Sequence, residues 1–223
     1  TAEKLGRAFA GVPVLTSGGS SIVDHIDDGA RVVVSTPGAE PVAERGYGAA
    51  VVLDTWAQLD RFDLRVDENA VRRWMSVGAL IRPRGDGGAM VIVADAALTP
   101  VQAVIRWDPV GFAAHELANR VELGFPPAVT MASIDGDTAS VNAFTDLIEL
   151  PEGADVLGPV PLPAGVRPPA GVPEGAELER LLVRTDRRHG RQLTAALTEA
   201  QVRRNTHHET GAVRVQVDPP TIG

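Results

Sequence analysis

The sequence predicts an α/β protein of two domains, a parallel-sheet domain over residues 1–124 and a smaller α+β domain over residues 125–223. In the first part, short and almost wholly apolar segments alternate with helix-like segments, as they do in a parallel sheet covered by helices on both faces. The Gly-Phe-Pro-Pro-Ala stretch at 124–128 interrupts this rhythm and predicts a domain boundary. Beyond it the segments follow the order β-α-β-β-α-β, which is typical of the split βαβ fold.

The elements of the first domain are predicted from apolar periodicity and capping residues. Val66, Val71 and Trp74 belong to one helical stripe of apolar side chains. Thr99 and Asp108 are each followed by a proline, which predicts two N-caps with proline at the first helical position. The predicted strands span 12–15, 31–36, 48–54 and 89–95, and the predicted helices span 2–9, 64–81, 99–107 and 108–123.

The elements of the second domain are separated by turn signals and by a proline-rich loop. Prolines in the segment 162–175 exclude a helix there. The segment 212–218 alternates apolar and polar residues, as a strand with one buried face does. The predicted strands span 128–134, 154–161, 178–185 and 212–218, and the predicted helices span 138–148 and 187–204.

The composition is that of a soluble globular protein, with 44% hydrophobic and 22% charged residues in a chain of 223. No apolar run approaches the roughly 18 residues that a membrane span needs, so we expect no membrane partner. The chain contains no cysteine, which excludes disulfides and thiolate metal sites from it and fits a reducing cytoplasm.

The net charge of −8 conceals a basic segment near the C-terminus. Between residues 180 and 214 there are eight arginines and only three acidic residues. A compact basic segment in an acidic protein is expected to bind phosphate groups or an acidic peptide. The alternative is an arginine-rich helix face that is simply solvated.

No catalytic or metal-binding motif is complete in this chain. His115 and Glu116 begin a zinc-protease signature, but Asn119 stands where the second histidine ligand is required. Neither a Walker A loop nor a G-x-G-x-x-G motif occurs, and no catalytic triad can be assigned from spacing. We therefore expect no catalytic residue and no metal ligand here.

Three short motifs are the most specific features of the sequence: Leu-Gly-Phe-Pro-Pro at 123–127, Val-Leu-Gly-Pro-Val-Pro at 156–161 and Val-Gln-Val-Asp-Pro at 215–219. Their order and spacing resemble the C-terminal part of the primosomal protein N′ family, the bacterial replication-restart helicases, in its actinobacterial form. The resemblance covers nearly the whole chain. It implies that residues 1–124 are most of the second RecA-like helicase lobe and that residues 125–223 are the C-terminal DNA- and partner-binding domain.

The resemblance also implies an upstream portion with a DNA-binding region, the first helicase lobe and a cysteine-rich zinc segment. We therefore expect no cofactor in this chain. Zinc is expected in the upstream segment, and ATP, if it is bound, is a ligand of the full-length protein.

Two helicase motifs of the family are altered in this sequence. In the fifth motif Thr36 matches the family pattern, whereas prolines such as Pro41 remove backbone donors that would contact phosphate. In the sixth motif, Leu80 and Pro83 stand where the family has two arginines. An arginine on the transferred phosphate is worth roughly 10³–10⁵ in rate.

Arg82 and Arg84 are displaced from the family positions by about two residues, and misplacement by about 1 Å already costs roughly 100-fold. The resemblance and these substitutions together predict that the loop is still present but lacks the arginines and backbone donors that would contact a phosphate.

The basic segment matches the part of the family that contacts branched DNA and docks the acidic tail of single-stranded DNA-binding protein. The family residue implicated in tail docking falls nearest Arg187. Arginine suits both ligands because its planar guanidinium pairs with phosphate or carboxylate in a bidentate manner. Helix spacing places Arg187 and Arg191 on one face, while the helix dipole alone explains Arg203 and Arg204 equally well. The candidate binding residues are Arg184, Arg187, Arg188, Arg191, Arg203 and Arg204.

We therefore predict a primosome protein that recognises stalled or abandoned replication forks, helps reload the replication machinery and lacks helicase activity. Its expected partners are branched DNA, single-stranded DNA-binding protein and other primosome proteins, in a nucleoid-associated cytoplasmic location that fits DNA replication and repair. Two alternatives stay open: an active ATP-dependent 3′–5′ DNA helicase of the same family, and a purely structural pair of domains. Because the second helicase lobe packs against the first in this family, we also expect an exposed apolar patch on residues 1–124.

Overall fold

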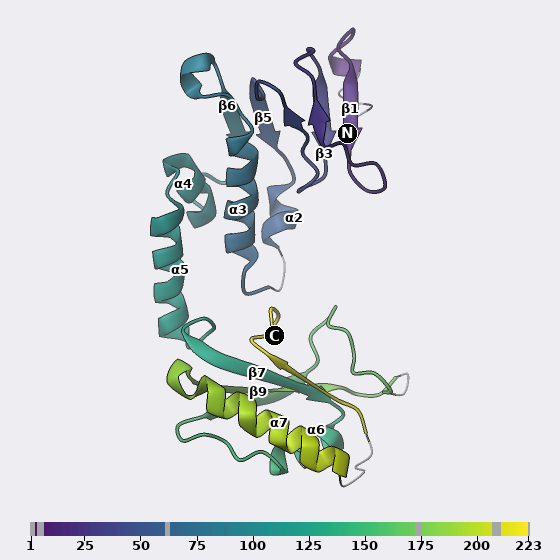
Figure 1. The fold of residues 1–223 in the computed structure, drawn as a ribbon, viewed down its shortest axis with the longest axis vertical. Coiled ribbons are helices and arrows are strands. Elements are labelled where there is room, and N and C mark those ends of the chain that lie inside the picture. The colour runs from purple at the N-terminus through teal and green to yellow at the C-terminus, as the bar shows by residue number, and fades with distance from the viewer. Residues whose placement is uncertain (1–2, 4–6, 61–62, 173–174, 207–210, 223) are drawn as a thin grey trace. The chain divides into compact units, whose positions relative to one another are not determined.

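The computed structural model describes residues 3, 7–60, 63–172, 175–206 and 211–222, and the chain forms two compact units. Unit 1 consists of Thr1–Arg61 and Val66–Phe112, and unit 2 consists of Phe62–Arg65 and Ala113–Gly223 (Figure 1). Most of the helix predicted at 2–9 lies outside the described residues.

The strands of unit 1 pair in parallel, as predicted, but they form separate pairs. Among the described residues there are three two-stranded sheets, with the orders β1-β3, β2-β4 and β5-β6. The prediction of one continuous parallel sheet is therefore wrong for this structure. The strands are β1 Val14–Ser17, β2 His25–Ile26, β3 Val32–Ser35, β4 Val42–Ala43, β5 Ala49–Val52 and β6 Ala89–Ile92.

One face of the β5-β6 sheet is exposed. Val52 belongs to the hydrophobic core of unit 1, and Ile92 packs against that core. Val51 and Val91 point to the opposite face of the sheet and are 58% and 54% exposed. The expectation that these strands are buried on both faces is wrong, because only one face is covered in unit 1. The exposed apolar surface expected on residues 1–124 is confirmed.

The helices of unit 1 cover the other face. Trp74 of α3 is almost fully buried, packs in one cluster with Val101 and Val104 of α4, and donates its ring N–H to Gln58 at 3.2 Å. This arrangement confirms the predicted apolar stripe of the helix at 64–81. The helices are α2 Thr55–Leu59, α3 Val66–Ala79, the short 3₁₀ helix η1 Arg84–Asp86, α4 Thr99–Arg106 and α5 Pro109–Leu123, the last of which continues into unit 2.

The two predicted N-caps have different outcomes. The Asp108 carboxylate accepts a hydrogen bond from the backbone N–H of Gly111 at 2.8 Å, so it caps α5 as predicted. Thr99 is the first residue of α4 rather than its cap, because the preceding Leu98 already has the extended cap conformation. Proline at the first turn of α4 is nevertheless present, at Pro100.

Unit 2 confirms the predicted element order β-α-β-β-α-β. Its four-stranded antiparallel sheet has the order β10-β7-β9-β8, with the two longest strands, β7 and β9, paired in the centre. The elements are β7 Val129–Gly136, α6 Thr138–Asp146, β8 Asp155–Pro161, β9 Glu179–Asp186, the 3₁₀ helix η2 Arg187–His189, α7 Gly190–Thr206 and β10 Val213–Val217.

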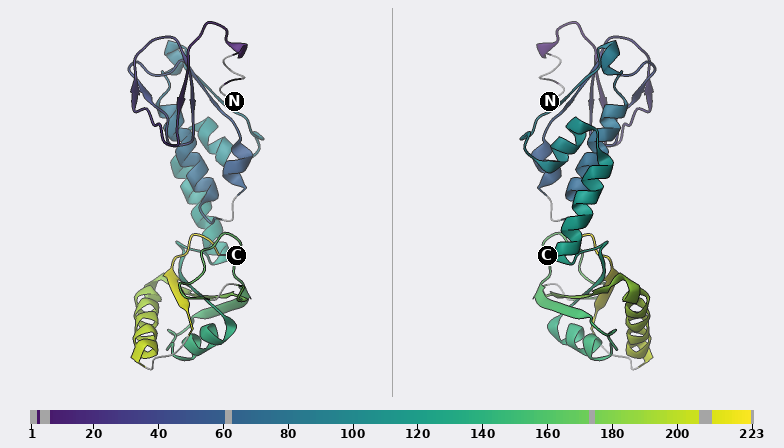
Figure 2. Two further views of the ribbon diagram at one scale, coloured as in Figure 1. Left: turned by 90° about the vertical axis from the view of Figure 1, so that its right-hand side faces the viewer. Right: turned by 90° about the vertical axis from the view of Figure 1, so that its left-hand side faces the viewer.

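Helices α6 and α7 lie on the same face of this sheet (Figures 1 and 2). Ile134 and Val183 from the central strands are fully buried against Phe144 of α6 and Leu193 of α7. Asp137 begins α6, and its carboxylate accepts from the backbone N–H of Ser140 at 2.9 Å and from its hydroxyl at 2.7 Å.

The opposite face of the same sheet carries a buried ion pair. Arg180 and Asp135 are 1% and 0% exposed, and two hydrogen bonds of 2.7 and 2.9 Å join them in a bidentate pair. Arg180 also donates to the carbonyl of Thr221 at 2.5 Å, which fixes the C-terminal segment to the sheet. Arg214 of β10 lies 3.7 Å from the same carboxylate.

Candidate functional site

The loop between β3 and β4, residues 36–41, corresponds to the altered fifth motif. Three of its backbone N–H groups already have partners within the protein. The N–H of Thr36 donates to the carbonyl of Ser17 at 3.0 Å, and the N–H of Ala39 donates to the carbonyl of Thr36 at 2.9 Å. The N–H of Gly38 donates to both carboxylate oxygens of Glu40, at 3.0 and 2.9 Å.

Side chains from neighbouring segments also hold this loop in place. The hydroxyl of Ser17 donates to the carbonyl of Ala39 at 2.6 Å, and the hydroxyl of Tyr47 donates to the carbonyl of Pro41 at 2.7 Å. The ring of Pro41 is fully buried. Gly18 packs so closely on Thr36 that a Cβ there would lie 2.4 Å from the Thr36 hydroxyl. The loop is thus anchored in unit 1 by its buried residues Ala39 and Pro41, whereas residues 36–38 are exposed.

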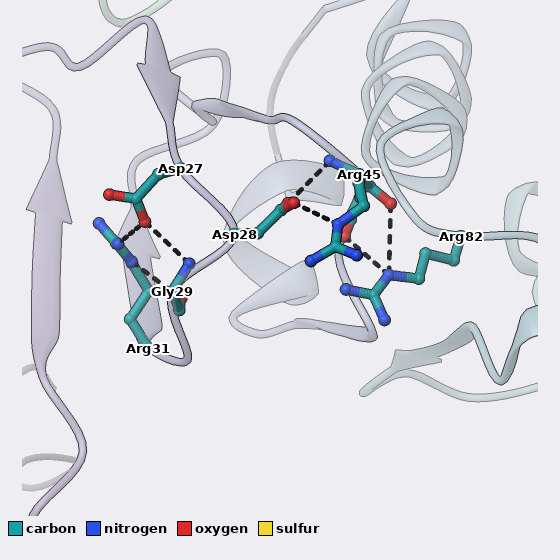
Figure 3. Close-up of polar contacts among 7 residues, drawn as sticks. Asp27, Asp28, Gly29, Arg31, Arg45 and Arg82 are labelled. Atoms are coloured by element: carbon teal, nitrogen blue, oxygen red, sulfur yellow. Dashed lines mark hydrogen bonds and ion pairs between the residues drawn. The ribbon is translucent and has the colours of Figure 1, made fainter.

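Arg82, the first candidate substitute for the missing arginines, is used to support an adjacent turn. Its Nε donates to the carbonyls of Arg45 and Gly46, at 3.3 and 3.1 Å (Figure 3). Arg45 is in turn paired with Asp28 through its guanidinium and donates to it from its backbone N–H at 2.9 Å. Burial alone would raise the pKa of Asp28, but the hydrogen bonds from Arg45 and the charges of Arg45 and Arg82 lower it below its ordinary value.

Leu80, at an arginine position of the sixth motif, and Arg84, the second candidate substitute, supply no anchored cation either. Leu80 is half-buried, and its carbonyl accepts from the N–H of Tyr47 at 2.9 Å. Arg84 is exposed in η1, and within the described ranges its side chain has no hydrogen-bond or ion-pair partner that would orient it. These side chains do not form a pair of positive charges directed at one phosphate position, as two motif arginines would.

The candidate arginines of unit 2 divide into two groups. Arg187, Arg188 and Arg191 lie together where β9 passes through η2 into α7, and all three are exposed. Arg188 pairs with Asp186 at 3.1 Å. In the part of the chain that the structure describes, the side chains of Arg187 and Arg191 form no hydrogen bond or ion pair.

Arg187 and Arg191 line an open groove of about 680 Å³, which we call the α7 groove. One wall is the face of α7 that carries Arg191 and Thr194, and the other is the start of β7. Two carboxylates, Glu199 and Asp218, also line it, so the groove carries both signs of charge. The residues that line it are Pro127, Val129, Thr130, Arg187, Gly190, Arg191, Thr194, Ala195, Thr198, Glu199 and Asp218.

The remaining three arginines are held by contacts within unit 2. Arg184 donates to Asp155 at 3.0 Å and to the carbonyls of Leu123 and Gly124 at 3.3 and 3.4 Å, so it stabilises the C-terminal end of α5.

Arg203 pairs with Glu149 at 2.9 Å, and Arg204 is 8% exposed and donates to the carbonyl of Gly211. These two residues lie about 20 Å along α7 from its start, at 1.5 Å per residue. The six predicted positions therefore do not form one continuous surface.

Sequence reasoning missed three residues that shape these two regions. Glu40 was not singled out, because the known local signal joins an Asp or Asn to the backbone two residues further on, whereas Glu40 accepts from the N–H of Gly38, two residues before it. Glu199 and Asp218 were not expected beside the arginines, because the return of β10 that brings Asp218 to the groove is a tertiary feature.

The described helices include none with the length and apolar character of a membrane span. Over the same residues, no three histidine, aspartate or glutamate side chains are grouped as a metal site would require.

Comparison with known proteins gives this geometry a family context. Residues 121–220 match the family described as "Primosomal protein N C-terminal domain". Over its whole length the chain is 52% identical to the "Probable replication restart protein PriA" of Mycobacterium leprae (strain TN), where it covers 34% of that protein. It is 50% identical to the proteins of the same name from Mycobacterium tuberculosis (strain CDC 1551 / Oshkosh) and Mycobacterium bovis (strain ATCC BAA-935 / AF2122/97), covering 35% of each.

The chain therefore spans about a third of the length of these relatives. The resemblance inferred from the three sequence motifs is confirmed by these matches. Residues 121–220 match the primosomal protein N C-terminal domain, and the chain as a whole is similar to about a third of the replication restart proteins named PriA.

Proposed function

We propose that this chain is part of a replication-restart protein that recognises stalled or abandoned forks, recruits replication proteins and has no helicase activity. The name of the mycobacterial relatives supports the restart role. Unit 1 is proposed to be a second RecA-like lobe that is kept as a scaffold, and unit 2 to be the binding domain. Zinc is expected only in an upstream segment of the complete protein.

The contacts of the altered motifs support the loss of helicase activity. Helicases need cations and backbone donors directed at the terminal phosphate of ATP, because negative charge develops there in the transition state. Leu80 supplies no charge, and Arg82 donates its Nε to two backbone carbonyls. The N–H of Gly38 is paired with a carboxylate. The Nε of Arg82 and the N–H of Gly38 would have to leave these partners before they could contact a phosphate.

The observation that carries the binding role is the pair of exposed arginines, Arg187 and Arg191, in the α7 groove. They are four residues apart, Arg187 in η2 and Arg191 in the first turn of α7, where the helix dipole adds to their positive potential. Charge-assisted hydrogen bonds from arginine to phosphate or carboxylate contribute about 1.5–3 kcal/mol each.

The carboxylates Glu199 and Asp218 favour a short acidic peptide over a DNA backbone inside the groove. A peptide can place its acidic residues at the arginines alone, whereas a continuous polyanion would also meet the two carboxylates. We propose that the acidic tail of single-stranded DNA-binding protein occupies the groove and that forked DNA reaches the exposed arginines at its edge.

The test is binding of the complete protein to a forked DNA and to an acidic tail peptide. Replacing Arg187 and Arg191 together by alanine is expected to weaken peptide binding at least tenfold and to flatten the salt dependence of DNA binding. Arg203→Ala is the matched control, because it removes an arginine of the same helix that is already paired with Glu149. Unchanged affinities of the double variant for both ligands would contradict the proposal.

A further inference from the structure

We infer that Glu40 is an internal substitute for an anionic ligand: its carboxylate occupies the N–H of Gly38 in the β3–β4 loop and repels phosphate from it. The inference deepens the proposed loss of helicase activity and rests on it. It assigns an active blocking role to a residue outside the two altered arginine positions.

The carboxylate of Glu40 contacts the Gly38 N–H as a bound anion would, with its oxygens accepting from a backbone donor. Both oxygens of Glu40 accept from the single N–H of Gly38, at 2.9 and 3.0 Å. Gly38 adopts a φ of +90°, a conformation that residues with a side chain rarely adopt. The loop directly follows the carboxyl end of the parallel strand β3, the end at which α/β proteins bind their ligands.

The negative charge is held in place by the surrounding loop. Ala39, next to Glu40, is buried, and its carbonyl accepts from the hydroxyl of Ser17 at 2.6 Å. Pro41, on the other side, is fully buried, and its carbonyl accepts from Tyr47 at 2.7 Å. Glu40 itself is half-buried.

The negative charge of Glu40 also acts on Tyr47, on the other side of Pro41. Burial raises the pKa of Tyr47, and the charge of Glu40 raises it further, while Arg31 lowers it. A phosphate that approached the Gly38 N–H would experience the same field from a shorter distance. Two unit charges about 4 Å apart repel strongly enough near a protein surface to lower affinity at least tenfold.

A purely local role for Glu40 makes a different prediction. If the carboxylate only stabilised the turn, a glutamine would replace it without consequence, because its amide oxygen still accepts from the Gly38 N–H. Glu40→Gln removes the charge and keeps this hydrogen bond. Glu40→Ala removes the charge and also frees the N–H.

The experiment measures binding of inorganic tripolyphosphate to the complete protein by titration calorimetry. Glu40→Gln is expected to bind about tenfold more tightly than the wild type, and Glu40→Ala at least as tightly as Glu40→Gln. Glu44→Gln is the matched control, since Glu44 is exposed, lies four residues further on and has no side-chain hydrogen bond or ion pair within the described ranges. Its affinity is expected to stay within twofold of the wild type.

The outcomes separate this inference from the proposed function. Equal affinity of the wild type, Glu40→Gln and Glu40→Ala would overturn the role of Glu40 and leave the proposed function standing. If Glu40→Ala does not fold, Glu40→Gln alone decides. DNA-stimulated ATP hydrolysis by the wild type would overturn the proposed function, whatever the tripolyphosphate affinities are.

Discussion

Removing the charge of Asp135 is expected to destabilise unit 2 severely. Asp135 and Arg180 are 0% and 1% exposed, so Asp135→Asn leaves the guanidinium of Arg180 buried without a counter-ion. The substitution also removes one of the two charge-assisted bonds and weakens the contact with Arg214 at 3.7 Å. Breaking a buried ion pair from one side costs about 3–5 kcal/mol.

The assay for Asp135→Asn is urea unfolding followed by circular dichroism, with the midpoint and slope compared between variants. Replacing both members, as Asp135→Leu with Arg180→Met, should recover most of the loss, because an apolar pair of similar volume avoids the desolvation penalty. Glu149→Gln is the control: it breaks the exposed pair with Arg203 and should cost less than about 1 kcal/mol. A loss below about 1 kcal/mol for Asp135→Asn would refute the reasoning.

Two further predictions concern α6 and α3. Hydrogen bonds from the hydroxyl and the backbone N–H of Ser140 lower the pKa of Asp137 below its ordinary value of 3.8. Its contribution to stability is therefore present above pH 3.8 and is lost as the pH falls through the lowered pKa, so Asp137→Asn should reduce the acid sensitivity of unfolding. A Cβ on Gly78 would lie 2.7 Å from the Trp107 ring, so Gly78→Ala should lower the free energy of unfolding by up to about 2 kcal/mol, whereas Gly85→Ala, in open space, should change it by less than about 0.5 kcal/mol.

The sequence was most informative where local periodicity and tertiary environment agree. Unit 2 has the predicted element order because its strands and helices are each bounded by turn residues and each bury one face in a single core. The predicted helix at 64–81 was confirmed for the same reason, since its apolar stripe, including Trp74, meets a complementary face of α4.

The predictions failed where the answer depends on residues that are distant in the sequence. The apolar segments of β5 and β6 read as strands buried on both faces, because composition cannot show that unit 1 covers only one of them. Arg204 read as a surface cation, but it is 8% exposed and donates to the carbonyl of Gly211. Thr99 read as a cap, although the conformation of Leu98 decides where α4 begins.

The candidate site was predictable in part. The loss of two arginines was visible at Leu80 and Pro83, since it is a property of single positions. The reassignment of Arg82 to the carbonyls of Arg45 and Gly46 required the structure, because these residues lie 36 and 37 positions away. The separation of Arg187 and Arg191 from the other arginines likewise follows from the contacts that hold Arg184, Arg203 and Arg204, which their spacing does not reveal.

The most direct test of the absence of helicase activity is the steady-state rate of ATP hydrolysis by the complete protein with a forked DNA. We predict no rise above the DNA-free background. Enzymes with intact catalytic sites turn over at roughly 1–1,000 per second. A DNA-dependent rate in that range, abolished by alanine at Arg82 or Arg84, would show that these arginines reach the terminal phosphate and would contradict the account.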